Sequence, residues 1–373
     1  MRLSLSSIFI WLFAINLNTQ NEIAFDWSRK ENNLYLDYVN FSFFKNNEYF
    51  SPFQKGYTGI GSINQISFHY YLNSNCYVKT GAHFLKYSGV QGFTEILPLI
   101  SVNCLLSPDL QMKFGHLNGN LDHGLNEILY LYDRSYQNNV ENGIQFLLKK
   151  KRLSFDLWMD WETFIFHGDP YQEEFVVGYT SDLLILEQKV HKIIISLDAI
   201  TTHKGGQIDI SNAAKQTTLN TYLGIRHEMI FSEMHKFFIE YASLDYKGLH
   251  APPPNDVNHL KFDNGWGRNI YFRHEYKQFA WQLGLWESRR FISPRGEYAY
   301  QSISRYDESF ADESRYLIHG KISFMNLERK IVHLELRGDI YHDLERKQMD
   351  YCYGIYIRLK SDFFLKKISN AQD

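Results

Sequence analysis

The most reactive group of side chains in the sequence lies in one segment, residues 117–139, LNGNLDHGLNEILYLYDRSYQNN. An imidazole close to carboxylates is the residue set used for general acid–base catalysis and for metal binding. The same set is common by chance, and the chain contains no H-E-x-x-H, C-x-x-C or phosphate-loop pattern. We therefore predict no metal, no cofactor and no catalytic residue, and we expect that the protein is not an enzyme. The charged and titratable residues of the segment are Asp122, His123, Glu127, Asp133 and Arg134.

A second candidate is a row of carboxylates at residues 156, 160 and 162. Residues two apart on one strand face are about 7 Å apart, which is a spacing that inverting glycosidases use. The water-filled side of a membrane barrel also carries carboxylates, balanced by basic groups on neighbouring strands. We favour this second interpretation. The candidate lumen-lining residues are Asp156, Asp160, Glu162, Arg226, Glu228, Arg273, Glu335, Arg337, Asp339 and Arg358.

A serine hydrolase of the G-x-S-x-G type is excluded, because that motif does not occur. Outer-membrane barrel hydrolases place their serine and histidine on the outer barrel wall near the membrane. Such pairs come from separate strands, so no local sequence pattern reveals them. An enzyme that acts on outer-membrane lipid or lipopolysaccharide therefore remains an alternative.

The elements that would position these residues are long two-faced strands, of which residues 152–166 (RLSFDLWMDWETFIF) are the clearest. Apolar and polar residues alternate there, with Leu153, Leu157 and Trp161 on one face and the carboxylates on the other. Alternation of period two indicates a β-strand. Strands of soluble proteins usually span about 5–6 residues, whereas this pattern runs for about 14, which favours a membrane barrel with lipid outside and water inside.

Similar alternation recurs along the chain and predicts a single all-β antiparallel up-and-down barrel of about 14–16 strands. Short turns and long links alternate between the strands, and the first link is long, which places both termini in the periplasm. The expected long links include 117–139 and, as the last, 342–348. The expected strands are 33–44, 58–71, 75–87, 95–106, 110–116, 140–149, 152–166, 174–186, 190–202, 217–231, 235–247, 266–277, 279–289, 314–326, 329–341 and 349–364.

The N-terminus has the features of a secretory signal, with a basic start and an apolar stretch from Leu3 to Leu17. We predict a signal peptide at 1–20, a periplasmic segment at 21–32, the barrel at 33–365 and a tail at 366–373. No later run approaches about 18 apolar residues, so no transmembrane helix is expected. The 26 Tyr, 28 Phe and 7 Trp in 373 residues suit the aromatic girdles of a barrel in the outer membrane of a Gram-negative bacterium.

The cysteine spacing bears on disulfide bonding, and the net charge bears on the classes of molecule that the protein could bind. Cys76, Cys104 and Cys352 have no paired spacing, so we expect free thiols, with a Cys76–Cys104 disulfide as the alternative. A net charge of −3 gives no nucleic-acid footprint. The expected partners are outer-membrane lipids, small polar solutes and the barrel-assembly machinery that inserts the chain, and the sequence leaves the oligomeric state open.

Several phrases resemble recurrent segments of a known group of proteins. Residues 43–62 (FFKNNEYFSPFQKGYTGIGS), 119–146 (GNLDHGLNEILYLYDRSYQNNVENGIQF), 156–162 (DLWMDWE) and 202–211 (THKGGQIDIS) are similar to segments of uncharacterised, porin-like outer-membrane β-barrels of the Bacteroidota. The resemblance spans roughly residues 33–290 and implies an outer-membrane barrel. It carries over no substrate and no catalytic residue.

Three functions follow as hypotheses. The first is a porin-like channel for small polar solutes, in which the loop 117–139 folds into the lumen and its mixed charges form a constriction. The loop could instead be held against the barrel wall by its own hydrogen bonds. The second hypothesis is a plugged barrel that assembles with surface glycans or a secretion partner, its lumen filled by inward aromatic residues. The third is the lipid-modifying enzyme.

Overall fold

The chain forms one closed antiparallel barrel of sixteen strands in sequence order, in which β1 pairs with β16. The computed structural model describes residues 29–307, 310–326 and 332–368, so the predicted signal peptide lies outside the described residues. The strands are β1 (Asn33–Glu48), β2 (Tyr57–Tyr71), β3 (Cys76–Tyr87), β4 (Glu95–Ser107), β5 (Leu110–His116), β6 (Asn142–Lys149), β7 (Leu153–Thr163), β8 (Glu173–Glu187), β9 (His191–Gly205), β10 (Gln216–Ile230), β11 (His235–His250), β12 (Asn264–Tyr276), β13 (Phe279–Arg289), β14 (Ser314–Met325), β15 (Val332–Asp343) and β16 (Gln348–Lys367).

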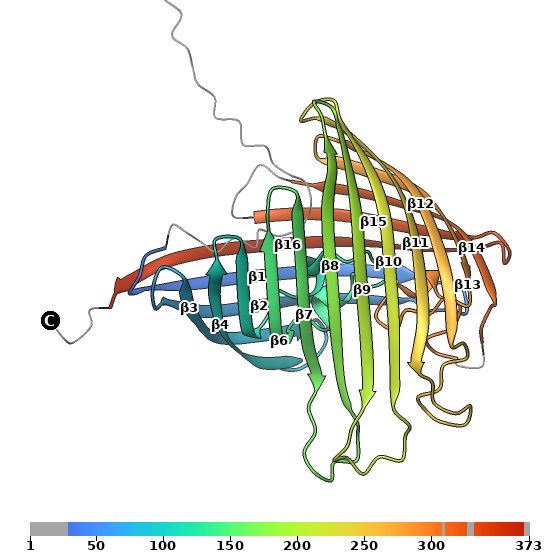
Figure 1. The fold of residues 1–373 in the computed structure, drawn as a ribbon, viewed down its shortest axis with the longest axis horizontal. Coiled ribbons are helices and arrows are strands. Elements are labelled where there is room, and N and C mark those ends of the chain that lie inside the picture. The colour runs from blue at the N-terminus through green and yellow to red at the C-terminus, as the bar shows by residue number, and fades with distance from the viewer. Residues whose placement is uncertain (1–28, 308–309, 327–331, 369–373) are drawn as a thin grey trace, which may run out of the picture.

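The predicted fold class is confirmed. In β7 the expected apolar face points outward, with Leu153, Leu157 and Trp161 exposed, while Asp156 and Asp160 are buried on the lumen side. Strands on opposite walls of a barrel tilt in opposite directions, so β7 to β11 cross β1, β2 and β15 at a steep angle in Figure 1. In the described residues, no helix is long and apolar enough to cross a membrane.

The alternation of short and long links holds except at the last one. The connection from β15 to β16 is a tight turn over residues 344–347, so the expected long link 342–348 is wrong. Asp343 explains the turn, because its carboxylate accepts hydrogen bonds from the backbone N–H groups of Glu345 and Arg346. The strands around this turn also run further than predicted, since β15 continues to Asp343 and β16 to Lys367.

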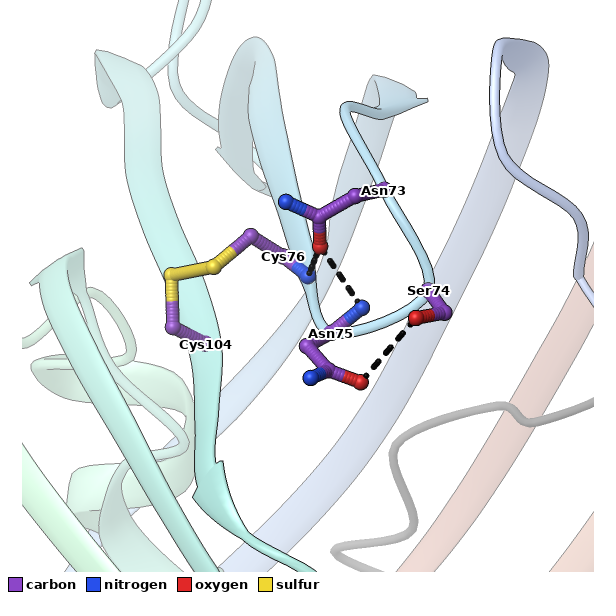
Figure 2. Close-up of a disulfide and its surroundings, with 5 residues drawn as sticks. All are labelled: Asn73, Ser74, Asn75, Cys76 and Cys104. Carbon is purple, nitrogen blue, oxygen red and sulfur yellow. Dashed lines mark hydrogen bonds between the residues drawn. A yellow bond between two sulfur atoms is a disulfide. The ribbon is translucent and has the colours of Figure 1, made fainter.

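A disulfide joins Cys76 of β3 to Cys104 of β4 (Figure 2). The expectation of free thiols is therefore wrong for these two residues and right only for Cys352, which is a buried free thiol. The two half-cystines are directly paired across adjacent antiparallel strands, which brings their side chains close together. Asn73 orders the preceding turn, because its side-chain oxygen accepts hydrogen bonds from the backbone N–H groups of Asn75 and Cys76.

Two long loops fill the outer half of the lumen, and we call them together the plug. The first, residues 117–141, contains η1 (Asn120–His123) and α1 (Arg134–Gln137); the second, residues 290–313, contains η2 (Tyr298–Tyr300). Backbone hydrogen bonds join them, from Leu131 N–H to the Arg295 carbonyl and from Glu297 N–H to the Glu127 carbonyl.

The plug has its own hydrophobic core inside the barrel. Ile128 and Leu129 of the first loop and Ile292 of the second pack against inward-facing apolar residues of β8 to β15. Tyr132 and Tyr136 pack on the opposite side, against β1, β2, β3 and β16. The first loop therefore crosses the lumen from wall to wall. The inward residues of its first contact are Val176, Ile200, Tyr222, Ala242, Leu244, Tyr246, Trp286, Leu317 and Tyr341.

Candidate functional site

His123 fixes the first plug loop to the barrel wall. Its Nδ1 lies 2.7 Å from an oxygen of Asp156 on β7, and its Nε2 lies 2.7 Å from an oxygen of Glu141. The imidazole also stacks on the indole of Trp158, with 3.6 Å between the ring centroids. Burial acts to lower the pKa of His123, but the two carboxylates outweigh it and raise the pKa to about 10. The ring is therefore a buried cation between two anions, which makes it an anchor.

The other charged residues of this loop are also paired with the wall. Glu127 accepts hydrogen bonds from Arg337, at 2.8 and 2.6 Å, and from Lys321, at 2.6 Å. Asp133 pairs with Lys45 and accepts a hydrogen bond from the Tyr57 hydroxyl. Arg134 donates a hydrogen bond of 2.6 Å to Glu162 on β7. Asp122 lines the cavity that lies below the plug.

Below the plug, the inner half of the lumen is a cavity of about 800 Å³, lined by charged, polar and apolar side chains. Its lining includes the short turns at Pro108–Asp109 and Lys277–Gln278, so it faces the periplasm. The structure places all ten candidate lumen residues on strand faces that point into the barrel. They form local ion pairs rather than one row, for example Arg226 with Glu228 at 3.0 Å and Arg337 with Asp339 at 2.7 Å.

The outer wall carries a second polar site, which sequence patterns did not single out as functional. His203 of β9 and Thr217 of β10 are directly paired in register, and the Thr217 hydroxyl lies 2.8 Å from Nδ1 of His203. Both side chains share the outward face with Leu197 and Leu223, which are 49% and 55% exposed. The pair lies at the ends of β9 and β10 that join the long loop 206–215, so it faces the outer leaflet.

An acid and a base flank this pair. Glu173 of β8 is paired with Gly205, so it is the diagonal neighbour of His203 on the same face, within reach of a long side chain. The charges of Glu173 and Lys215 both act on His203. Gly205 leaves room here, because a Cβ atom at this position would lie 3.2 Å from Nε2 of His203 and 2.8 Å from Cγ of Lys215.

Apolar side chains surround the polar site. Phe175 stacks on His203 with 4.8 Å between ring centroids, and Trp161 packs against Phe175 at 5.2 Å. Two neighbouring loops, 164–172 and 206–215, are joined by backbone hydrogen bonds and reach beyond the bottom rim in Figure 1. They expose further apolar residues, so a lipid tail can lie along this face. The exposed residues are Phe164, Phe166, Tyr171, Ile208 and Ile210.

The expected strand 190–202 ends just before His203, so the sequence predicted a loop at this residue. It is instead the third-last residue of β9, which runs to Gly205. Thr217 stands 14 residues away on the next strand, so the pair appears only when the strands are set in register. Within the part of the chain that the structure describes, no group of three or more His, Cys, Asp or Glu residues is placed to hold a metal ion.

The barrel resembles solved outer-membrane proteins. It matches the outer membrane protein OprD from Pseudomonas aeruginosa with a TM-score of 0.53 and 7% identity, covering 90% of this chain and 95% of that one. It matches OmpT, an outer membrane protein of Vibrio cholerae, with a TM-score of 0.51 and 8% identity, covering 88% of this chain and 100% of that one. At such low identity the likeness shows the fold alone. The expected localisation in the outer membrane is confirmed.

The family is shown by sequence. No curated protein matches the chain, but residues 26–368 match the family model described as lipid A 3'-O-deacylase-type. A deacylase is an enzyme, so the expectation that the protein is not an enzyme is wrong. The error came from searching for local catalytic motifs, which a site spread over separate strands does not contain. The match spans the whole barrel, and the chain belongs to the lipid A 3'-O-deacylase-type family.

Proposed function

We propose that the protein is an outer-membrane hydrolase that removes the ester-linked acyl chain at the 3'-position of lipid A, and that Thr217 and His203 carry out the reaction. The observation that carries this assignment is the 2.8 Å contact between the Thr217 hydroxyl and His203 Nδ1 on the lipid-facing wall. A hydroxyl beside an imidazole is the pair that nucleophilic ester hydrolysis requires. The membership of a deacylase family supports the reaction class.

The reaction follows from the positions of these groups. The Thr217 oxygen attacks the ester carbonyl while its proton passes to Nδ1 of His203. The imidazolium then protonates the departing sugar oxygen, which leaves the acyl group on Thr217. Water, deprotonated by the same imidazole, releases the fatty acid and restores the hydroxyl. Glu173 stabilises the imidazolium, and Lys215 supplies positive charge on the side where the oxyanion develops.

The surroundings of the pair fit a lipid substrate. The site lies at the outer end of β9 and β10, next to the aromatic pair Trp161 and Phe175. Aromatic residues mark the membrane interface in barrels, and an acyl ester lies close to that interface. The acyl chain would run down the apolar wall below the pair, where Leu197 and Leu223 are exposed. The ester carbonyl would then reach Thr217 without leaving the membrane.

The test is deacylation of purified lipid A by the purified barrel in mixed micelles, followed by mass spectrometry. Thr217→Ala and His203→Gln should each lower the rate by about 10²–10⁴-fold, the usual contribution of such a group. Thr221→Ala and His227→Gln are matched controls, because these residues share the same outward face of β10 nearer the periplasmic end. Equal rates in all four variants and the wild type would reject the catalytic role of Thr217 and His203. A wild-type protein that is folded but inactive would reject the hydrolase activity itself.

A porin-like channel for small polar solutes is the second proposal. The porin-like fold of the structural neighbours favours it, and the constriction segment with Glu127 and Asp133 lies across the lumen. Conduction requires the two plug loops to leave the lumen, because their apolar residues fill its outer half. Stepwise currents of the purified barrel in planar bilayers would support a channel, and a silent, folded barrel would count against it.

A further inference from the structure

The periplasm-facing cavity takes no part in the chemistry proposed for the outer wall. It is large enough for a small ligand, since ligand sites usually measure about 300–1,000 Å³. The plug closes it on the outer side, and the short turns surround its mouth. The cavity is therefore closed on the outer side and open to the periplasm.

The wall formed by β8 to β12 carries more negative than positive charge. Four carboxylates and two guanidinium groups line the cavity from these strands. Arg226 lies 3.3 Å from a Glu240 oxygen and 3.7 Å from an Asp182 oxygen. Arg273 pairs with Glu275 at 2.8 Å. The four carboxylates are those of Asp182, Asp198, Glu240 and Glu275.

Asp198 lacks a counter-ion of its own. The residue is only 5% exposed, and the negative charges of Asp182 and Glu240 act on it more strongly than the positive charge of Arg226, which is already paired with Glu240 and Glu228. Within the described residues, no lysine, arginine or histidine nitrogen lies within 4.0 Å of its carboxylate. A buried carboxylate without a cation is costly, so a bound cation would stabilise this wall.

A second group in the cavity is also unpartnered. Glu275 lines the cavity and is 95% buried. Its Oε2 atom has no hydrogen-bond partner. Its other oxygen is taken by Arg273. The cavity therefore offers one buried acceptor without a donor in addition to the Asp198 charge.

The opposite wall does not compensate for this surplus. Three of its basic residues are held by acids of their own: Arg337 and Lys321 bind Glu127, and Arg358 lies 3.6 Å from Glu335. The other two lysines that line the cavity, Lys149 and Lys277, lie beside the short periplasmic turns at its mouth. Aromatic groups stand on the acidic wall, where the hydroxyls of Tyr222 and Tyr271 both donate to Glu240. Aromatic faces beside carboxylates favour organic cations over inorganic ones.

We propose that this cavity is a binding site for small organic cations that carry primary amines, which enter from the periplasm. The ammonium group binds between Asp198 and Asp182, and a second donor on the same molecule reaches Glu275. The site is independent of the outer-wall chemistry, because the strand wall separates the two faces.

The test is calorimetric titration of the purified full-length barrel in detergent with spermidine, with sorbitol as a neutral probe of similar length. Spermidine should bind and sorbitol should not. Asp198→Asn should weaken spermidine binding about tenfold or more, because it removes a charge-assisted contact. Asp245→Asn is the matched control, since Asp245 is an exposed carboxylate on the outward face of β11.

Two results of the titration distinguish a specific binding site from nonspecific charge attraction. Loss of affinity in Asp198→Asn with retention in Asp245→Asn supports the site. Absence of spermidine binding by the wild type, or an equal loss in both variants, overturns it. If Asp198→Asn does not fold, Glu275→Gln replaces it, with a smaller loss of affinity expected because the removed charge is shared with Arg273. Deacylation by the folded variants should be unchanged.

Discussion

The hydroxyl of Thr217 lies 2.8 Å from Nδ1 of His203, across two neighbouring strands on the lipid-facing wall. Neither residue belongs to a loop or a helix, so the geometry of the sheet alone sets their separation. Backbone pairing fixes the two strands in register, so a pair held by them is already positioned for an incoming ester. In the proposed reaction, this preorganisation replaces the specialised turn that carries the nucleophile in many soluble hydrolases.

Glu173→Gln should lower kcat of deacylation by about 10²-fold or more while leaving KM within a few fold, because Glu173 stabilises the imidazolium that forms after substrate binds. Steady-state kinetics with purified lipid A measures both constants. Glu174→Gln is the control, since Glu174 points to the other face and pairs with Lys204 at 3.0 Å. A kcat that is the same in the two variants would remove Glu173 from the mechanism.

Gly178→Ala should destabilise the barrel by about 1–3 kcal/mol, because a Cβ atom there would overlap the indole of Trp158. The indole stacks on His123, so the clash also displaces the plug anchor. Gly338→Ala is the matched control on another strand, where the nearest atom to a new Cβ is 3.8 Å away. Thermal unfolding in detergent compares the two, and equal stability would contradict the packing role.

The plug anchor should be sensitive to alkaline pH. The folded pKa of His123 is about 10, above the ordinary value of 6.5, so its contribution to stability is full below pH 6.5 and is lost as the pH rises towards 10. Proteolysis of the loop 117–141 should therefore accelerate across this range in the wild type. His123→Gln should be cleaved faster at pH 6 and show a flatter pH dependence. An identical pH profile for the two proteins would exclude the imidazolium as the anchor.

Removing the disulfide should lower stability without altering the fold. The bridge closes a segment with a sequence separation of 28 residues, which corresponds to about 3–4 kcal/mol in the chain-entropy account. The Cys76→Ser/Cys104→Ser double variant should therefore unfold at a lower temperature in heat-modified gel electrophoresis. Cys352→Ser is the control, as Cys352 is a free thiol. Unchanged unfolding of the double variant would show that strand pairing alone holds β3 to β4.

The barrel itself could be predicted because the residue pattern that produces it lies within each single strand. Each strand must separate lipid from water, so the alternation of Leu157 with Asp156 and Asp160 is visible in any short window. The same logic predicted about 14–16 strands, of which the structure has sixteen, and it predicted the inward faces that carry the lumen residues. It failed at residues 344–347, where an Asp-capped turn replaced an expected loop.

The contacts between distant segments could not be predicted in this way. The plug depends on backbone bonds between Leu131 and Arg295, more than 160 positions apart in the chain, and no periodicity encodes such a meeting. The disulfide and the Thr217–His203 pair depend on strand register. A count outward from the loop 206–215 would set His203 opposite Thr218, one residue away from the observed register, so loop length alone does not reveal the pair.

The apolar core within the lumen divides the barrel into two compartments of different dielectric character. In the outer half, side chains such as Leu244 and Trp286 meet the plug, so this part of the wall carries apolar residues on its inner surface as well as on its lipid-facing surface. The plug also carries charges, but these are held in ion pairs with the wall, such as Asp133 with Lys45 and Arg134 with Glu162. A charged solute that enters from the periplasm therefore meets a vestibule that ends at a packed cap, and the lumen offers it no continuous path while both plug loops are in place.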